Sequence, residues 1–453
     1  MRRLSSYPGP TTKKSHLSSS TLFVILAILA GAGSSQFLLS RMGPAEGDAF
    51  SLDIGWAGKV AAHHLLPGPF ALANLSLTQQ TSGISDSPLG GDIPPSRVIR
   101  DPYSVFSGIS VDTLNDEVVI ADDNLSNLLV YSRTLMSEGI AEPSRRIGGS
   151  KTRIDFICGV AIDPLSREIY TVNNDTQDNL LVFSHEQNGD AAPSRELKVD
   201  HGAWGVALDG DHNEVAITIQ HINKISIYRK TAVGDEKPLR VIQGPTTGLA
   251  DPHGIFIDSQ NHEIFVTNHG SWHLVETGVS QSTEDWFSRL EIPSLVPSRA
   301  RFEAPSIRIY SRIANGDSAP LRTIQGPRTK LNLPLGIYVD RERNEIAVAN
   351  DGGNSILFFD RTAHGDVAPV RTIEGLATGL KNPAGVFIDT KNDEIWVSNW
   401  GNHSATVYPR TATGNVAPLR TIRSAPRGVP LPGLGNPGAV AYDPKRDQLL
   451  VPN

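Results

Sequence analysis

The sequence predicts an all-β protein built as a β-propeller, and three observations lead to this fold class. The 453-residue chain is rich in turn formers, with 41 Gly and 31 Pro. Its apolar residues, 39% of the total, stand in short runs rather than in long helical stripes. A motif with the spacing of a four-stranded unit recurs seven times after residue 100. These features predict many short strands arranged as repeated blades.

Residues 1–42 carry the charge pattern of an export signal. Basic residues, among them Lys13 and Lys14, precede the apolar run LFVILAILAGAG at 22–33, and polar residues follow it. This run is shorter than the roughly 20 residues that cross a bilayer, and the small residues at 30–32 suit a signal peptidase, which favours a cleaved signal peptide. The alternative is an uncleaved membrane tether through residues 21–40. Both place the rest of the chain in the periplasm or outside the cell, either soluble or anchored.

Residues 43–94 are rich in Gly, Ser, Pro and Leu without clear periodicity. This composition predicts a linker with room for one strand. The propeller is therefore expected over residues 95–453.

Each repeat opens with a small residue, three mostly apolar positions and an Asp, as in GVAID and GIFID. These Asp anchors are Asp112, Asp163, Asp209, Asp258, Asp340, Asp389 and Asp443. Five residues later stands Glu, or Gln448 in the last repeat, followed by an alternating segment such as EIYTVNN. A third apolar segment and a fourth that begins with Pro-x-Arg complete the repeat. The pattern predicts four strands per blade, joined by tight polar turns.

The spacing of the anchors sets the number of blades. Successive anchors are 51, 46, 49, 82, 49 and 54 residues apart, which places an insertion at 271–303. A segment of the fourth-strand type at 95–100 precedes the first full repeat, whereas the seventh supplies only its first two strands. We therefore expect seven blades, with the N-terminal strand pairing with the C-terminal strands to close the ring. The third strand of the closing blade is expected at 70–77; the alternative is a ring of six blades with an irregular seventh element.

The segments DPHGIFIDSQNHEIFVTN and NPAGVFIDTKNDEIWVSN resemble NHL repeats. The resemblance covers residues 95–453, and a more distant similarity extends to propellers of the gluconolactonase and lyase type. It implies a propeller but does not decide between enzyme and binding scaffold. Glu stands where the NHL family commonly carries Arg, which indicates a bacterial, exported subgroup.

Charge and cysteine content exclude several classes of function. With a net charge of −7 the chain has no global basic field, so we expect no nucleic-acid partner. Cys158 is the only cysteine, which rules out an intramolecular disulfide and multi-cysteine metal sites. Its place beside the expected channel wall favours a small buried hydrophobe over a nucleophile.

Residues in front of the first-strand glycine should face the central channel. They are Ser107, Cys158, Trp204, His253, Leu335, Ala384 and Gly438. This set lacks the carboxylates that a lactonase-type metal site needs. Such a site would have to use residues ten positions after the anchors, namely Asp122, Asn173, Asn268, Asn350 and Asn399. Because nearly every repeat carries them, turn capping is the favoured interpretation, as it is for the Asp anchors.

The arginines of the Pro-x-Arg motif fall at the start of each fourth strand. They are Arg97, Arg145, Arg195, Arg240, Arg322, Arg371 and Arg420. We expect them to blunt the outer edge and to pair with acids of a neighbouring blade, with a polyanion-binding belt as the alternative.

Histidine and tryptophan break the repeat in the third and fourth units. Five His lie on loops that should share one face of the ring, and Trp residues accompany them. The resulting candidate binding residues are His201, Trp204, His221, His253, Asn268, His269, Trp272, His273, Asn399 and Trp400. Solvated loop histidines, a transition-metal site and a His-based acid–base site remain open. Should a divalent metal bind, His253 and His269 are its candidate ligands; no catalytic residue and no cofactor are assigned.

The sequence thus predicts a scaffold that binds a protein, glycan or small molecule at the face bearing the 271–303 insertion. The alternative function is a metal- or His-dependent lactonase- or lyase-like enzyme acting on a small extracellular substrate.

Overall fold

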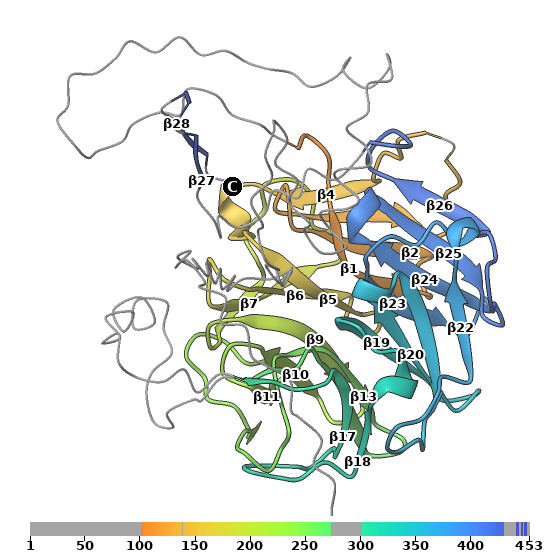
Figure 1. The fold of residues 1–453 in the computed structure, drawn as a ribbon. Helices are drawn as coiled ribbons and strands as arrows, with labels where there is room; N and C mark the ends of the chain where they lie inside the picture. Colours follow the sequence, from red (N-terminus) through yellow and green to blue (C-terminus); the bar gives the residue numbers. More distant parts are fainter. Residues whose placement is uncertain are drawn as a thin grey trace, which may run out of the picture. The chain divides into compact units, whose positions relative to one another are not determined.

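The computed structural model describes residues 101–137, 139–272, 301–429, 441–443, 445–446 and 448–450. Within residues 101–429 it contains six four-stranded antiparallel sheets, each with its strands in sequence order. The sheets are blades around a common axis, with their first strands innermost (Figure 1). The all-β propeller predicted from the repeats is confirmed.

The strands begin and end close to the predicted motifs. The first strands are β1 (Phe106–Asp112), β5 (Ile157–Asp163), β9 (Ala203–Asp209), β13 (Pro252–Asp258), β19 (Pro334–Asp340) and β23 (Pro383–Asp389). The second strands are β2 (Glu117–Asp122), β6 (Glu168–Asn173), β10 (Glu214–Ile219), β14 (Glu263–Asn268), β20 (Glu345–Asn350) and β24 (Glu394–Asn399). The third strands are β3 (Asn127–Ser132), β7 (Asn179–Ser184), β11 (Lys224–Arg229), β17 (Ser306–Ser311), β21 (Ser355–Asp360) and β25 (Ser404–Pro409). The fourth strands are β4 (Arg145–Gly148), β8 (Arg195–Lys198), β12 (Arg240–Ile242), β18 (Arg322–Gln325), β22 (Arg371–Glu374) and β26 (Arg420–Arg423).

The remaining described elements are short. Five 3-10 helices are η1 (Ser150–Thr152), η2 (Pro327–Thr329), η3 (Asp351–Gly353), η4 (Leu376–Thr378) and η5 (Trp400–Asn402). The insertion in the fourth blade begins and ends with the paired strands β15 (Ser271–Trp272) and β16 (Arg301–Phe302). Among the described residues, no helix has the length and apolar character needed to cross a membrane.

The Asp anchors close the turns between first and second strands. In the fourth blade the carboxylate of Asp258 accepts hydrogen bonds from the backbone N–H of Asn261 at 3.1 Å and from its side-chain amide at 2.7 Å. The equivalent Asp389 binds Asn392 in the same way. The anchors therefore cap turns, in agreement with the interpretation from the repeat.

Glycine precedes each apolar run because the first strands crowd together at the axis. A Cβ atom on Gly108 would stand 2.6 Å from the carbonyl oxygen of Cys158 in the next blade. At Gly336 it would stand 2.8 Å from the carbonyl oxygen of Ala384. These contacts are with backbone, which cannot swing aside, so the repeat requires a residue without a side chain here.

Two sets of ion pairs follow the outer part of the ring. The Pro-x-Arg arginines pair with the Glu that opens the second strand of their own blade, as in Arg145–Glu117 at 2.7 Å and Arg240–Glu214 at 2.7 Å. The sequence predicted pairing with a neighbouring blade, and the structure corrects that assignment. It also explains the unusual Glu of the repeat, which receives the fourth-strand arginine.

Pairing between blades is made instead by the first residue after each third strand, which we call the junction cation. The six junction cations are Arg133, His185, Lys230, Arg312, Arg361 and Arg410. Each contacts an acid of the preceding blade, for example Arg361 with Glu263 at 2.6 Å. Arg133 of the first blade contacts Glu394 of the sixth at 3.1 Å, so the set runs once around the ring.

The ring closes directly between the sixth and first blades. Trp396 packs in one hydrophobic cluster with Phe106, and the Ser398 hydroxyl donates to the Ser107 carbonyl oxygen at 3.2 Å. The propeller thus has six blades, the alternative of the two predicted numbers, and not seven. Each described blade takes its four strands from one stretch of chain, because the six inter-blade cores already complete the circle.

The seventh repeat forms a separate two-stranded sheet, β27 (Ala441–Asp443) and β28 (Gln448–Leu450), in which Asp443 lies opposite Gln448. It keeps the register of the first two strands of a blade. The predicted closing strands at 70–77 and 95–100, the linker and the export signal lie outside the described residues.

Candidate ligand site at the channel mouth

The six first strands surround a narrow central channel with a cavity volume of about 90 Å³. Its wall carries one aliphatic side chain from each blade: Ile109, Val160, Val206, Ile255, Ile337 and Val386. Ser107, Cys158, Trp204 and Ala384, predicted to face the channel, also line it. Burial, with a smaller contribution from Asp123, raises the pKa of the Cys158 thiol well above its ordinary value, so the thiolate is disfavoured.

Polar groups gather at one end of the channel, which we call the mouth. Here the loops leading into the first strands meet the residue that follows each second strand. In blade order, the residues after the second strands are Asp123, Asn174, Gln220, His269, Asp351 and Trp400. Only Asp occurs twice among these six, whereas the preceding position is Asn in four of the six blades. Two of these residues, His269 and Trp400, were candidates from the sequence, and the other four were not.

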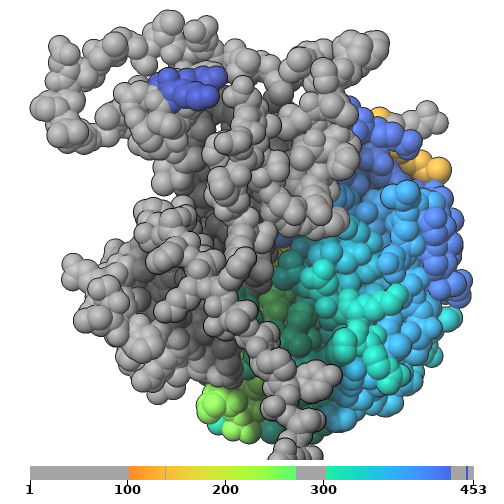
Figure 2. All heavy atoms as spheres, viewed as in Figure 1, coloured from red at the N-terminus to blue at the C-terminus, as the bar shows by residue number. Residues whose placement is uncertain are grey.

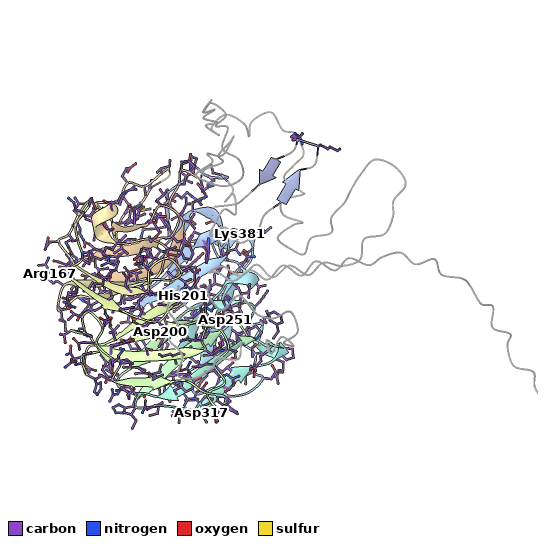
Figure 3. All side chains as sticks on the ribbon, turned by 90° about the vertical axis from the view of Figure 1, so that its left-hand side faces the viewer. Arg167, Asp200, His201, Asp251, Asp317 and Lys381 are labelled. Carbon is purple, nitrogen blue, oxygen red and sulfur yellow. The ribbon has the colours of Figure 1, made fainter. Side chains whose placement is uncertain are left out.

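Figure 3 separates the two ends of the propeller. Arg167, in the turn between β5 and β6, lies at the left edge of the view. His201, Asp251 and Lys381, all on loops that lead into first strands, lie to its right. The space-filling view shows the cyan to blue residues of the fourth to sixth blades forming one continuous surface (Figure 2).

Two tryptophans approach each other at the mouth from opposite sides of the ring. Trp204 lies at the start of β9 in the third blade, and Trp400 directly follows β24 in the sixth blade. Their ring centroids are 6.3 Å apart and their planes differ by 27°. In a ring of six, these blades face each other, so the indole pair lies across the opening of the channel.

A first cluster beside the tryptophans contains Asp251, His253 and His269, all from the fourth blade. The two imidazole rings are stacked, with centroids 3.6 Å apart and planes 20° from parallel. His253 Nδ1 lies 2.9 Å from the backbone oxygen of Asp251, and its ring meets Trp204 edge-on at 4.5 Å. His269 Nδ1 lies 3.9 Å from the Asp251 carboxylate.

Burial controls the charge of this first cluster. It raises the pKa of Asp251 to about 8 and lowers the pKa of His253 to about 3. The pKa of His269 is well below its ordinary value, because of burial and then of the neighbouring His253. At neutral pH the cluster therefore holds a protonated carboxyl beside two neutral imidazoles.

A second cluster contains Asp175, His201 and His221 and joins the second blade to the third. His201 Nε2 and His221 Nε2 lie 3.8 and 3.9 Å from Asp175 Oδ1. The imidazole centroids are 5.1 Å apart. Both clusters have their ligand-type atoms within 4.8 Å of one another and could hold a metal ion.

The remaining candidate binding residues from the sequence belong to neither cluster. The amide oxygen of Asn268 accepts the Ala250 N–H at 2.9 Å, and that of Asn399 accepts the Lys381 N–H at 3.2 Å. These side chains hold the loops that lead into their own blades. Trp272 belongs to β15, and His273 lies outside the described residues.

Comparison with known proteins finds no family and only distant structural likeness. No family model matches the chain. No curated protein matches it either. Solved structures do: one chain of a nidogen/laminin complex is 14% identical, with a TM-score of 0.44, and the match covers 71% of this chain and 92% of that one. The hydrazine synthase of Kuenenia stuttgartiensis is 13% identical, with a TM-score of 0.45, and the match covers 71% of this chain and all of that one. These likenesses are too distant to indicate a family or a function.

Proposed function

We propose that the protein is a binding protein whose propeller holds a small, planar organic molecule at the channel mouth. The observation that carries this proposal is the Trp204–Trp400 pair, which faces across the mouth with a centroid distance of 6.3 Å. A flat group between two indoles needs roughly 7 Å, since each stacked contact takes about 3.5 Å. A small outward movement of Trp400, which is partly exposed, provides that space.

The surroundings of the pair suit an uncharged ligand that forms hydrogen bonds. The protonated Asp251 and the neutral His253 offer both donors and acceptors without a strong charge. Below them the aliphatic channel wall excludes charged groups. An apolar cavity with a few polar groups at its rim is the usual form of a small-molecule site.

The test is a fluorescence titration of the full-length protein with a panel of purines, pterins, flavins and indoles. At least one compound should change the tryptophan emission and bind with a micromolar Kd. Trp400→Ala should weaken that compound at least 10-fold, whereas Leu165→Ala, an exposed control in the turn between β5 and β6, should not. The proposal is wrong if no panel compound binds, or if Trp400→Ala binds as tightly as the parent.

A second candidate function, a His-dependent hydrolase or lyase, is favoured by the first cluster. A protonated Asp251 and a neutral His269 whose nearest ligand atoms are 3.9 Å apart form an acid and a base in one pocket. A lactone panel assayed with the full-length protein tests it. Asp251→Asn should abolish turnover of any substrate found, whereas the exposed control Leu165→Ala should leave turnover unchanged.

We also propose that the protein is exported from the cytoplasm and that its propeller is related to NHL propellers. The charged N-terminus and the LFVILAILAGAG segment support transport out of the cytoplasm. N-terminal sequencing of protein recovered from the periplasm and the medium tests it: a start close to residue 33 supports cleavage, and an intact N-terminus in the membrane fraction supports a tether.

A further inference from the structure

The second cluster lies where three loops of two blades meet. Asp175 follows β6 of the second blade, His201 leads into β9 of the third, and His221 follows β10. We propose that Asp175, His201 and His221 form a binding site for one divalent transition-metal ion of the zinc class. This site is independent of the planar-ligand proposal, because it uses neither tryptophan.

The spacing of the three ligand atoms suits a shared ion. His201 Nε2 and His221 Nε2 stand 3.8 and 3.9 Å from Asp175 Oδ1. These distances are too long for hydrogen bonds. Two ligands at about 2.0–2.1 Å from one zinc ion are separated by roughly 3.3–4.1 Å, depending on the angle between them. Small side-chain rotations therefore suffice to bring all three atoms to one ion.

Neighbouring groups set the orientation of the imidazoles. Asp178 Oδ1 lies 3.1 Å from His201 Nδ1, which places the proton on Nδ1 and directs the Nε2 lone pair toward Asp175. A carboxylate behind a ligating histidine is the usual outer partner of a metal site. The Gln220 amide lies 2.7 Å from His221 Nε2 as a donor, which likewise marks that nitrogen as the one with the lone pair. A bound ion would take the place of this amide.

The loops are held in position before any ion binds. The Gly202 N–H donates to the Asn174 carbonyl oxygen at 3.2 Å, and the Gln220 N–H donates to the Gly202 carbonyl oxygen at 2.9 Å. The Asn174 amide donates to the Ala203 carbonyl oxygen at 3.0 Å. These bonds tie together the three segments that carry the ligands. Preorganised ligands lose little entropy on binding, which favours affinity.

The stacked first cluster suits an ion less well. Imidazole lone pairs lie in the ring planes, and the nearly parallel planes of His253 and His269 direct them side by side rather than toward one point. His253 Nδ1 is also within hydrogen-bond distance of the Asp251 backbone oxygen. In the second cluster the ring planes differ by 45°, which lets the lone pairs converge.

Donor chemistry defines the metal. Two imidazoles and one carboxylate match zinc, cobalt, nickel or ferrous iron and not the oxygen-only sets of calcium and magnesium. Asp175 and His221 retain 15% and 17% of their side-chain exposure, so solvent can reach the remaining coordination positions.

The test uses full-length protein without a polyhistidine tag, dialysed against EDTA and titrated calorimetrically with Zn²⁺ alone. One equivalent should bind, and Co²⁺ should give the visible absorption of a nitrogen- and oxygen-ligated site. His201→Ala and Asp175→Asn should weaken binding at least 100-fold, and Asp178→Asn by about 10–100-fold. His364→Ala, on the exposed outer rim, is the matched control and should leave binding unchanged.

Each opposite result overturns the assignment. Absence of Zn²⁺ and Co²⁺ binding, or undiminished binding in His201→Ala, would show that the second cluster is not a metal site. Loss of binding in His269→Ala with full binding in His201→Ala would move the ion to the first cluster. Should His201→Ala not fold, as judged by circular dichroism, the isosteric Asp178→Asn and the cobalt spectrum decide the question.

Discussion

Buried carboxyl groups behave in opposite ways at the blade junctions and at the channel mouth. At the junction between the fifth and sixth blades, burial would raise the pKa of Asp340, but hydrogen bonds from Arg410 lower it below its ordinary value. At the mouth, burial prevails and raises the pKa of Asp251 to about 8 and that of Asp351 to about 6. The junction carboxyl thus stabilises the fold when it is ionised, whereas the mouth carboxyls cost stability in that form. The mouth carboxyls lower the stability of the fold and do not recur in every blade. Function is expected at such positions.

The largest effect should follow from breaking a junction. Arg410→Met leaves the fully buried Asp340 without its guanidinium partner, so the free energy of unfolding should fall by about 3–5 kcal/mol. Arg167→Met, which removes an exposed pair with Glu186, should cost no more than about 1 kcal/mol. Urea denaturation at pH 7 measures both.

The pH dependence of the Arg410→Met effect tests whether the lost ion pair causes the loss of stability. A carboxyl whose pKa is lowered on folding contributes stability above its unfolded value, about 4, and loses it as pH falls through the folded value. The difference between parent and Arg410→Met should therefore be full at pH 7 and shrink below about pH 4. A difference that stays constant over this range would show that lost packing, and not the ion pair, is responsible.

A second prediction concerns the crowding at the axis. Gly336→Ala places a Cβ within 3 Å of backbone atoms of the sixth blade and should destabilise the protein by about 1–3 kcal/mol. The control is Gly210→Ala, where a Cβ meets no atom within 4 Å. Equal effects of the two variants in urea denaturation would contradict the close-approach explanation of the glycine column.

The same glycine column explains which part of the fold was predictable. Six repeats have Gly at this position, and their strands are found at the predicted places; the seventh has Ala439. The number of blades was not predictable in this way. Anchor spacing counts repeats, whereas the ring is closed by packing between the sixth and first blades.

The site was less predictable than the fold. His201, His221, His253 and His269 were recognised because they break the repeat, and the structure gathers them into two clusters. Their acidic partners, including Asp175 and Asp251, were missed. A lone Asp in a polar loop looks like a turn residue, and only the curvature of the ring brings it to a histidine from another loop. The stacking of Trp204 on Trp400 was equally hidden, since 196 residues separate them and the contact requires opposite blades of a six-membered ring.

Removal of a mouth carboxyl should stabilise the protein, whereas removal of a junction cation destabilises it. Asp351→Asn keeps the shape of the side chain but removes a carboxyl whose pKa is about 6 in the folded protein. Because a raised pKa contributes stability only at low pH and loses it as pH rises through the folded value, the parent should weaken between about pH 4 and pH 6. The variant should be more stable than the parent by about 1 kcal/mol at pH 8 and equal to it at pH 4. Thermal unfolding at the two pH values measures this; a variant less stable at pH 8 would mean that the ionised carboxyl is held by a partner.

The smallest expected effect is at the one junction cation that is a histidine. His185 Nε2 lies 2.6 Å from Glu117, in the position that Lys230 fills one blade later, and both side chains are largely buried. An ammonium in this position would pair with the Glu117 carboxylate as Lys230 pairs with Asp163 in the next blade. His185→Lys should therefore strengthen the junction between the first and second blades by about 0.5–1 kcal/mol at pH 8. His364→Lys, the same change on the exposed rim, should leave stability unchanged. A gain in both variants would point to the net charge of the chain rather than to the junction, whereas a gain confined to His185→Lys would show that the repeated ion pairs limit the stability of the ring at its weakest member.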